Sequence, residues 1–139
     1  MLKPQPHIDE LSHPFWQGCN EERLLIQRCD NPQCGRAVFY PRVACPHCHA
    51  DSLSWIEASG RARIVSCTTI HRTHHDGFNA EAPYLFAAVE LEEGALMYAQ
   101  LLAEPFQDAE LIGKPAAVEF VRHGPAQRIA VFRPVETQP

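Results

Sequence analysis

The chain has 139 residues, of which 45% are hydrophobic, enough for one ordinary domain or two small ones. It carries 12 Lys and Arg against 17 Asp and Glu, a formal net charge of −5. This composition excludes a disordered chain, no apolar run reaches the length of a membrane-spanning helix, and the acidic balance disfavours a protein that grips phosphate backbones.

Residues 1–23 are expected to form an extension that includes one short helix over residues 15–22. The N-terminus lacks the apolar stretch of a signal peptide, so we expect a cytoplasmic protein. Pro14 can occupy the first turn of the helix, because its missing N–H costs nothing there. Phe15 and Trp16 give the helix a bulky apolar beginning. A helix this short is marginal alone, so it must dock on its own domain or on a partner.

Residues 24–55 contain two cysteine pairs with the spacing of a metal site, Cys29-x4-Cys34 and Cys45-x2-Cys48. Zn²⁺ takes four ligands tetrahedrally, and two thiolate pairs on neighbouring turns supply them with little strain. Strands are expected before the first pair, from residue 24 to 26, and between the pairs, from 37 to 40. This pattern is typical of a zinc ribbon with a structural metal, and the alternative is a set of unligated buried thiols.

Two histidines beside the cysteine pairs and the two remaining cysteines are not expected to be metal ligands. His47 and His49 flank Cys48 and can in principle replace a cysteine ligand, but with four cysteines available we expect them to face solvent. Cys19 and Cys67 lie in stretches that look structural. We expect both to be buried, inert thiols in a reducing compartment.

Residues 56–139 show a repeated strand pattern that begins after a linking strand over residues 53–57. Tyr84 to Leu91 alternates, with Leu85, Ala87, Val89 and Leu91 on one face. Three strands, a short helix and two strands follow one another at residues 61–72, 84–91, 95–102, 104–112, 116–121 and 128–132. This is the order of an OB-fold, a five-stranded Greek-key barrel with its helix between strands three and four.

A short helix, a zinc ribbon and an OB-fold, in this order, resemble the acyl-CoA-associated zinc-ribbon/OB-fold family. The first half of the resemblance is carried by Pro14-Phe15-Trp16, Leu24 to Cys29, Cys34-Gly35, Tyr40-Pro41-Arg42 and Cys45-Pro46-His47-Cys48. The second half is carried by Gly60, Ser66 to Arg72, Pro83-Tyr84, Glu93-Gly94, Gly113-Lys114-Pro115 and Phe132-Arg133-Pro134. The match covers roughly residues 12–135, and the first cysteine spacing is longer than the family's usual x2.

The resemblance implies a mainly β protein with a rubredoxin-like zinc ribbon that is not itself an enzyme. Such proteins are accessory subunits of thiolase-superfamily enzymes, where they support assembly and the channel for the acyl-CoA thioester. We therefore expect Phe15 and Trp16 to dock on a thiolase-like enzyme. Arg72 and Phe78 are expected to face acyl-CoA at the shared interface, because a guanidinium fork matches phosphate geometry and loops on rigid barrels hold function.

Two other functions compete with the accessory role. Zinc ribbons and OB-folds often bind single-stranded nucleic acid, and Tyr84, Phe86 and Tyr98 would supply stacking platforms on the outer barrel face. The acidic residues Glu90, Glu92 and Glu93 adjoin them, however, so no nucleic-acid partner is expected. No membrane partner is expected either, because no apolar run is long enough to span a bilayer.

Catalysis by this chain itself is the second competing function. It would use His71, His74, His75 and Asp76, which lie close together in the sequence. Adjacent histidines on an extended backbone point in opposite directions, and no nucleophile elbow or phosphate loop is present. A solvated polar loop is therefore the expectation.

Overall fold

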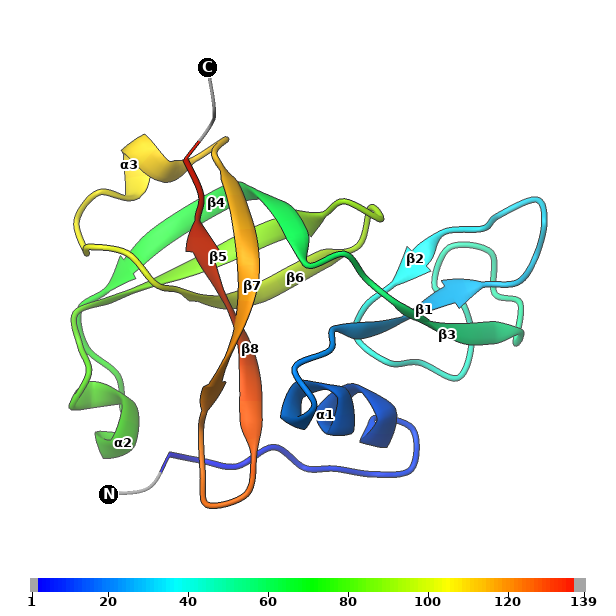
Figure 1. Cartoon of the computed structure of the whole chain (residues 1–139), viewed down its shortest axis with the longest axis horizontal. Coiled ribbons are helices and arrows are strands. Elements are labelled where there is room, and N and C mark those ends of the chain that lie inside the picture. Colours follow the sequence, from blue (N-terminus) through cyan, green and yellow to red (C-terminus); the bar gives the residue numbers. More distant parts are fainter. Residues whose placement is uncertain (1–2, 137–139) are drawn as a thin grey trace.

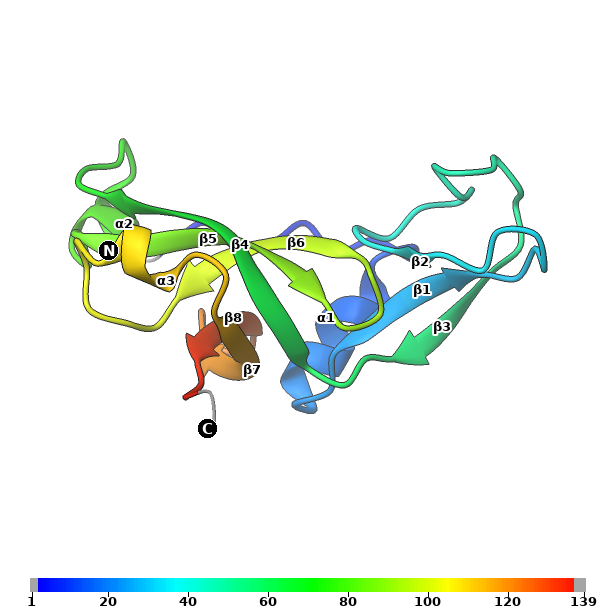
Figure 2. The ribbon, with the colours of Figure 1, turned by 90° about the horizontal axis from the view of Figure 1, so that it is seen from above.

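The N-terminal half of the computed structural model, which describes residues 3–136, is a small three-stranded sheet with one helix (Figure 1). Its elements are α1 (His13–Asn20), β1 (Leu25–Cys29), β2 (Ala37–Val38) and β3 (Leu53–Glu57). The strand order is β2-β1-β3, and β1 pairs antiparallel with both neighbours. The loops between the strands extend away from the rest of the molecule, as Figure 2 shows from above.

The C-terminal half is a closed barrel of five strands with the order β4-β5-β6-β8-β7. Its elements are β4 (Arg61–Ile70), α2 (Asp76–Asn79), β5 (Tyr84–Leu91), β6 (Leu96–Leu101), α3 (Asp108–Leu111), β7 (Pro115–Arg122) and β8 (Arg128–Pro134). β4 closes the barrel by pairing with β7, and β6 pairs in parallel with β8. This topology, with α3 between the third and fourth barrel strands, confirms the predicted OB-fold.

The barrel core comes from alternate residues of its strands. Leu85, Ala87, Val89 and Leu91 of β5 are all buried, while Phe86 and Glu90 between them are exposed. Phe132 of β8 has no exposed surface and lies in the same core. Period-two patterning therefore places the apolar face of each strand inside the closed barrel.

Helix α1 joins the two halves. It contacts both β1 and β8, and its Phe15 and Cys19 are buried in the core that continues into the barrel. At its C-terminal end, the Oδ1 atom of Asn20 accepts a hydrogen bond of 2.8 Å from the backbone N–H of Arg128. The predicted helix is thus confirmed, and it docks on its own barrel.

The ribbon and the barrel are also joined by a short covalent connection, residues 58–60. Gly60 has a φ of +83°, and a Cβ atom there would lie 2.7 Å from Cγ1 of Val118 on β7. A side chain at this position would require both a strained backbone and a displaced Val118 side chain. The connection is therefore a tight turn packed against the barrel.

The N-terminal segment crosses the tip of the β7–β8 hairpin. Lys3 forms an ion pair of 2.6 Å with Glu81, and its Nζ atom lies 5.4 Å from the centre of the Phe78 ring. Gln5 donates a hydrogen bond to the backbone carbonyl of His123. These contacts hold α2, the hairpin tip and the N-terminal segment together.

Sequence and structure differ mainly at short elements. The expected polar loop after β4 contains the short helix α2, where His75 caps the first turn by accepting a hydrogen bond from Gly77 N–H. The helix expected over residues 104–112 is limited to Asp108–Leu111. Local sequence patterns rarely define single helical turns, because they make too few contacts of their own. Within residues 3–136, no helix has both the length and the apolar character needed to cross a membrane.

Candidate metal centre and aromatic groove

The four cysteines of the ribbon converge at its outer end. Cys29 ends β1, Cys34 lies in the turn that follows, and Cys45 and Cys48 lie in the loop between β2 and β3. All four Sγ atoms are within 4.8 Å of one another, with 3.5 Å between Cys29 and Cys48 and 3.8 Å between Cys34 and Cys45. Four sulfurs about 2.3 Å from a tetrahedral Zn²⁺ would be separated by about 3.8 Å, so this arrangement fits the ion.

Hydrogen bonds around the sulfurs favour thiolates at this site. The backbone N–H of His47 points at Cys45 Sγ, and the Asn31 amide points at Cys48 Sγ at 3.6 Å. The Ala50 N–H, and then the Asn31 amide, lower the pKa of Cys48 to about 7. The Asn31 N–H acts to lower the pKa of Cys29 as well, but burial and the neighbouring thiols raise it to about 12.

Four thiolates whose sulfurs lie within 4.8 Å of one another repel each other unless a cation lies between them. Zn²⁺ removes this repulsion because it binds the deprotonated form of every ligand. The chain therefore has the ligand set of a structural zinc site: Cys29, Cys34, Cys45 and Cys48 would hold the ion. A closed four-sulfur site leaves no coordination position for a substrate, so the zinc supplies stability rather than chemistry.

Gln27 positions the second cysteine pair, a role that the sequence did not reveal. Its side chain is buried, accepts a hydrogen bond of 2.7 Å from Arg42 N–H and donates one of 3.0 Å to the Arg42 carbonyl. The amide thus replaces a strand partner for the loop that leads to Cys45. A glutamine directly after the apolar Leu24-Leu25-Ile26 run is the only sequence feature that could have indicated this.

The expectations about the remaining cysteines and the nearby histidines have mixed outcomes. His47 and His49 are exposed, as expected. Cys19 is fully buried, and this burial raises the pKa of its thiol to about 12. Cys67 is half-buried rather than buried, because it packs beside the core; burial and then the charge of Asp108 raise its pKa.

An aromatic groove of about 420 Å³ lies between α1, the ribbon and the outer face of the barrel. Aromatic residues from distant parts of the chain line it: Phe15, Trp16, Phe39, Tyr40, Phe78, Tyr84, Phe86 and Tyr98. The Trp16 indole N–H donates a hydrogen bond of 3.0 Å to the Tyr40 hydroxyl, and the Phe86 and Tyr98 rings are stacked 6.5 Å apart. Among residues 3–136, none of those that line the groove is charged.

The structure brings three predicted site residues, Phe15, Trp16 and Phe78, to this one groove. Phe15 is only 4% exposed and contributes mainly to the core behind Trp16. Arg72 is exposed just beyond the end of β4 and does not line the groove. The sequence gave no indication that Trp16 and Phe78 are neighbours, because their proximity depends on barrel closure.

The histidines near α2 and β4 make structural contacts. His75 caps α2, and the ring of His71 lies 5.4 Å from that of Phe106. Among the described residues, the four ribbon cysteines are the only group of metal-ligating side chains close enough to share an ion. His71 and His74 are exposed, while His75 has a defined capping role.

Comparison with known proteins identifies both halves of the chain. Residues 16–54 match the family model described as the ChsH2 rubredoxin-like zinc ribbon domain, and residues 55–121 match the ChsH2 C-terminal OB-fold domain. A solved structure described as the Ltp2-ChsH2(DUF35) aldolase contains a similar chain. The two are 31% identical with a TM-score of 0.79, and the match covers 94% of this chain and 98% of that one.

Two curated relatives are longer than the region they share with this chain. A probable enoyl-CoA hydratase alpha subunit of Thermomonospora curvata is 33% identical over 138 residues, which are 99% of this chain and 41% of that protein. A DUF35 domain-containing scaffold protein of Methanocaldococcus jannaschii is 35% identical over 96 residues, 68% of this chain and 66% of that protein. The chain thus spans less than two thirds of the length of either relative.

Proposed function

The chain belongs to the family of ChsH2 zinc-ribbon and OB-fold proteins, and on this basis we propose that it is a non-catalytic subunit of a thiolase-like enzyme. In this role it supports assembly of the complex and covers the passage of an acyl-CoA thioester. The uncharged aromatic groove is the observation that carries the proposal. The name of the similar aldolase chain and the scaffold names of the DUF35 relatives support it. Zinc thiolates need reducing conditions, so we place the complex in the cytoplasm.

The chemistry of the described residues supports a non-catalytic role. A nucleophilic cysteine needs a lowered pKa and access to substrate, whereas burial raises the pKa of both Cys19 and Cys67. The other cysteines form the zinc site. His75 accepts a hydrogen bond from Gly77 N–H through Nδ1, so that atom is engaged in capping.

The aromatic groove supplies the docking surface in this proposal. Tyr98 is 65% exposed and Tyr40 is 41% exposed, which is unusual for large aromatic side chains grouped together. Aromatic side chains in shallow pockets commonly contribute most of the free energy of an interface. Trp16 serves as the anchor, with Phe15 fixing its position from the core.

The thioester passes along the end of the groove that contains Phe78. This ring belongs to α2, which the N-terminal segment holds in place through Lys3. Arg72 lies just beyond β4 and is proposed to meet the CoA phosphates from outside the groove. Phe78→Ala should therefore lower kcat/KM of the complex for the thioester while leaving the complex assembled.

Docking is tested with the thiolase-like enzyme that co-purifies with this chain. Trp16→Ala should weaken the complex by about 2 kcal/mol or more, the usual cost of losing an aromatic hot spot. Tyr98→Ala tests the same surface without touching the core, and Phe106→Ala is its matched control, because Phe106 is 64% exposed and lies outside the groove. Equal affinities for the Tyr98 and Phe106 variants and the unmodified chain would refute docking through the groove.

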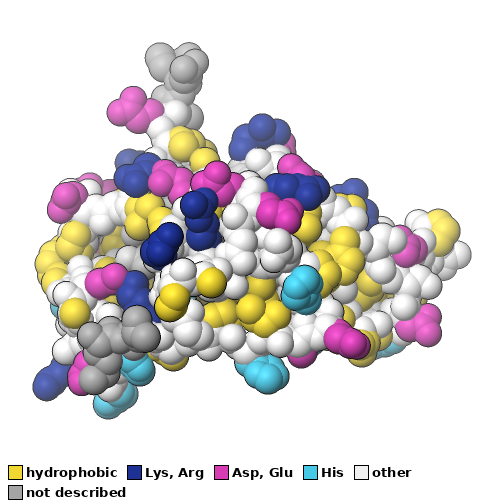
Figure 3. Space-filling view, turned by 60° about the horizontal axis from the view of Figure 1, so that its bottom comes forward, with side chains coloured by type: hydrophobic (Ala, Val, Ile, Leu, Met, Phe, Trp, Pro, Cys, Tyr) yellow, Lys and Arg dark blue, Asp and Glu magenta, His cyan; other side chains and the backbone are white. Residues whose placement is uncertain are grey.

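Single-stranded nucleic acid is the second candidate ligand, and the stacked Phe86 and Tyr98 rings favour it. The charge distribution opposes it, since basic and acidic side chains are intermingled on the face shown in Figure 3. A mobility shift with single-stranded oligonucleotides at low salt distinguishes the two functions. A salt-sensitive shift that Tyr98→Ala abolishes would support nucleic-acid binding.

A further inference from the structure

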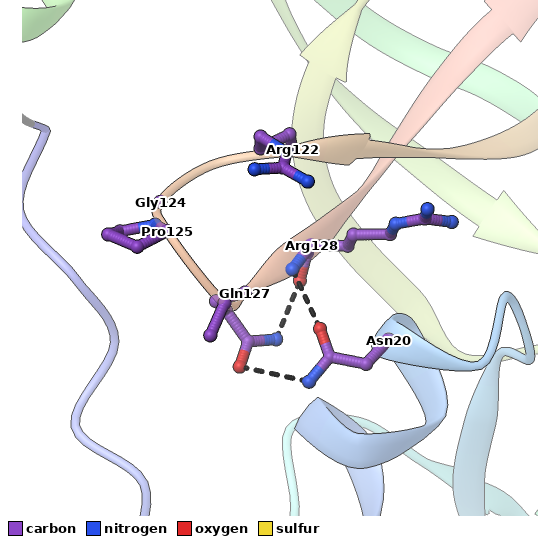
Figure 4. A pocket seen from close by; sticks show the side chains of 7 residues that line it. Asn20, Arg122, Gly124, Pro125, Gln127 and Arg128 are labelled. Carbon is purple, nitrogen blue, oxygen red and sulfur yellow. Dashed lines mark hydrogen bonds between the residues drawn. The ribbon is translucent and has the colours of Figure 1, made fainter.

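Two arginines face each other at the turn end of the β7–β8 hairpin. Arg122 and Arg128 are direct partners in the antiparallel ladder, so their side chains emerge on the same face of the hairpin (Figure 4). Like charges directly opposite each other destabilise a strand pair unless an anion lies nearby. This juxtaposition requires an explanation.

Only one of the two arginines has a partner of opposite charge. Arg128 forms an ion pair of 3.0 Å with Glu22, which follows α1. Arg122 is exposed and makes neither an ion pair nor a side-chain hydrogen bond with any residue that the structure describes. Glu22 thus explains the position of Arg128, whereas Arg122 adds a positive charge that has no acidic partner among residues 3–136.

The space beside the arginines is a preformed pocket of about 200 Å³. Hydrogen bonds fix the floor of this pocket. Gln127 Nε2 donates to the backbone carbonyls of Trp16 and Arg128. Asn20 Nδ2 donates to Gln127 Oε1, and Asn20 Oδ1 accepts from Arg128 N–H (Figure 4). Gly124 lines the same pocket at the hairpin tip. Two guanidinium groups beside a fixed polar floor have the geometry that recognises a phosphate group.

The pocket and the aromatic groove lie beside the same two elements. Asn20 borders the pocket and Trp16, four residues earlier in α1, borders the groove, while β8 contributes Arg128 to one and Ile129 to the other. Residues four apart share one face of a helix. A charged subsite therefore adjoins an uncharged one along α1.

We propose that Arg122 and Arg128 bind the phosphate of an organic phosphate whose uncharged part extends toward the aromatic groove. This inference rests on the proposed function, in which the ligand is a CoA thioester: the phosphates of its nucleotide lie at the arginines and its pantetheine arm points toward Trp16. Binding of the anion to Arg122 offsets the repulsion between the two guanidinium groups. Glu22 keeps Arg128 oriented and limits the affinity of the site.

The proposal is tested by NMR titration of the isolated 139-residue chain with adenosine 3′,5′-bisphosphate, pantetheine and inorganic phosphate. The bisphosphate should shift the amide signals of Gly124 and Gln127 saturably, and pantetheine should shift signals of the groove instead. Arg122→Gln should weaken bisphosphate binding about tenfold, the cost of one charge-assisted hydrogen bond pair. This substitution removes no ion pair and no side-chain hydrogen bond among the described residues, so the variant should remain folded.

Matched variants make the test decisive. Arg63→Gln is the control, because Arg63 is an exposed strand arginine with a long ion pair of 3.9 Å to Glu90. Arg122→Lys should retain intermediate affinity, since it keeps the charge but loses the fork. The proposal is overturned if the bisphosphate produces no saturable shifts, if inorganic phosphate binds equally well, or if the Arg122 and Arg63 variants behave alike.

A further outcome separates this site from the docking surface. If Arg122→Gln leaves bisphosphate binding unchanged but weakens the complex with the enzyme, the arginines bind a carboxylate of that protein and the phosphate site is refuted. Failure of the titration alone leaves the docking proposal standing, because the Trp16 and Tyr98 variants test that surface without any nucleotide.

Discussion

The barrel and α1 share one continuous apolar core, whereas the buried residues at the outer end of the ribbon are Cys29, Val38 and Cys45. In the barrel, burial of apolar side chains opposes the loss of chain entropy. The outer ribbon has almost no apolar surface to bury, so its folding free energy must come from metal ligation. One chain therefore combines a barrel that folds by apolar packing with an outer ribbon that folds by metal coordination.

Loss of a zinc ligand should have the largest effect, and it should unfold the outer ribbon while leaving the barrel folded. Cys45→Ser removes one zinc ligand, and apparent binding free energies of structural zinc are about 10–16 kcal/mol. The outer ribbon should lose its metal and unfold while the barrel strands remain protected in amide hydrogen exchange. Cys67→Ser, which lies outside the site, should retain one zinc per chain. Metal analysis of both proteins checks this, and a folded, metal-free ribbon would contradict it.

A core substitution in the barrel should destabilise the barrel and leave zinc binding by the ribbon unchanged. Leu101 of β6 is 1% exposed, and Leu101→Ala should destabilise the barrel by about 2–5 kcal/mol through the cavity it leaves. Zinc stoichiometry should not change in the folded protein. Leu96→Ala on the same strand is the control, because Leu96 is 42% exposed. Thermal unfolding monitored together with zinc release would show whether the two halves are independent.

Gln27 tests whether the ribbon also depends on its few internal hydrogen bonds. Gln27→Ala leaves the Arg42 backbone N–H and carbonyl unsatisfied, which should cost about 1–3 kcal/mol. Zinc should therefore be lost to a chelator faster than from the unmodified chain. Gln33→Ala, at an exposed position of the same ribbon, should release zinc at the original rate. Identical rates for both variants would show that coordination alone fixes the second cysteine pair.

The smallest effect concerns the barrel surface and its pH dependence. A hydrogen bond from Arg133, and then its charge, lower the pKa of Glu119 below its ordinary value of 4.5. The pair therefore stabilises the folded state above that value and loses its contribution as the pH falls through the lowered pKa. Because both side chains are largely exposed, the contribution should be below about 1 kcal/mol. Glu119→Gln should flatten the acid limb of a pH–stability curve only slightly.

The sequence predicted those features that depend on local patterns. The apolar face of Leu85, Ala87, Val89 and Leu91 predicted β5 with its observed bounds, and the cysteine spacing identified all four sulfurs that the fold brings together. α2 was missed because a single turn capped by His75 has no apolar periodicity. The groove was missed because Trp16 and Phe78 meet only after the barrel closes, and such long-range proximity leaves no trace in one sequence.

The tight connection at Gly60 has a consequence for how this chain associates with another protein. Two modules on a flexible linker would lose orientational freedom on binding a common surface. Residues 58–60 and α1 have already removed that freedom, so the ribbon and the barrel present their surfaces at one fixed angle. The chain thus behaves as one rigid body. A partner protein that binds the ribbon is thereby also aligned with the barrel, without a further loss of orientational freedom.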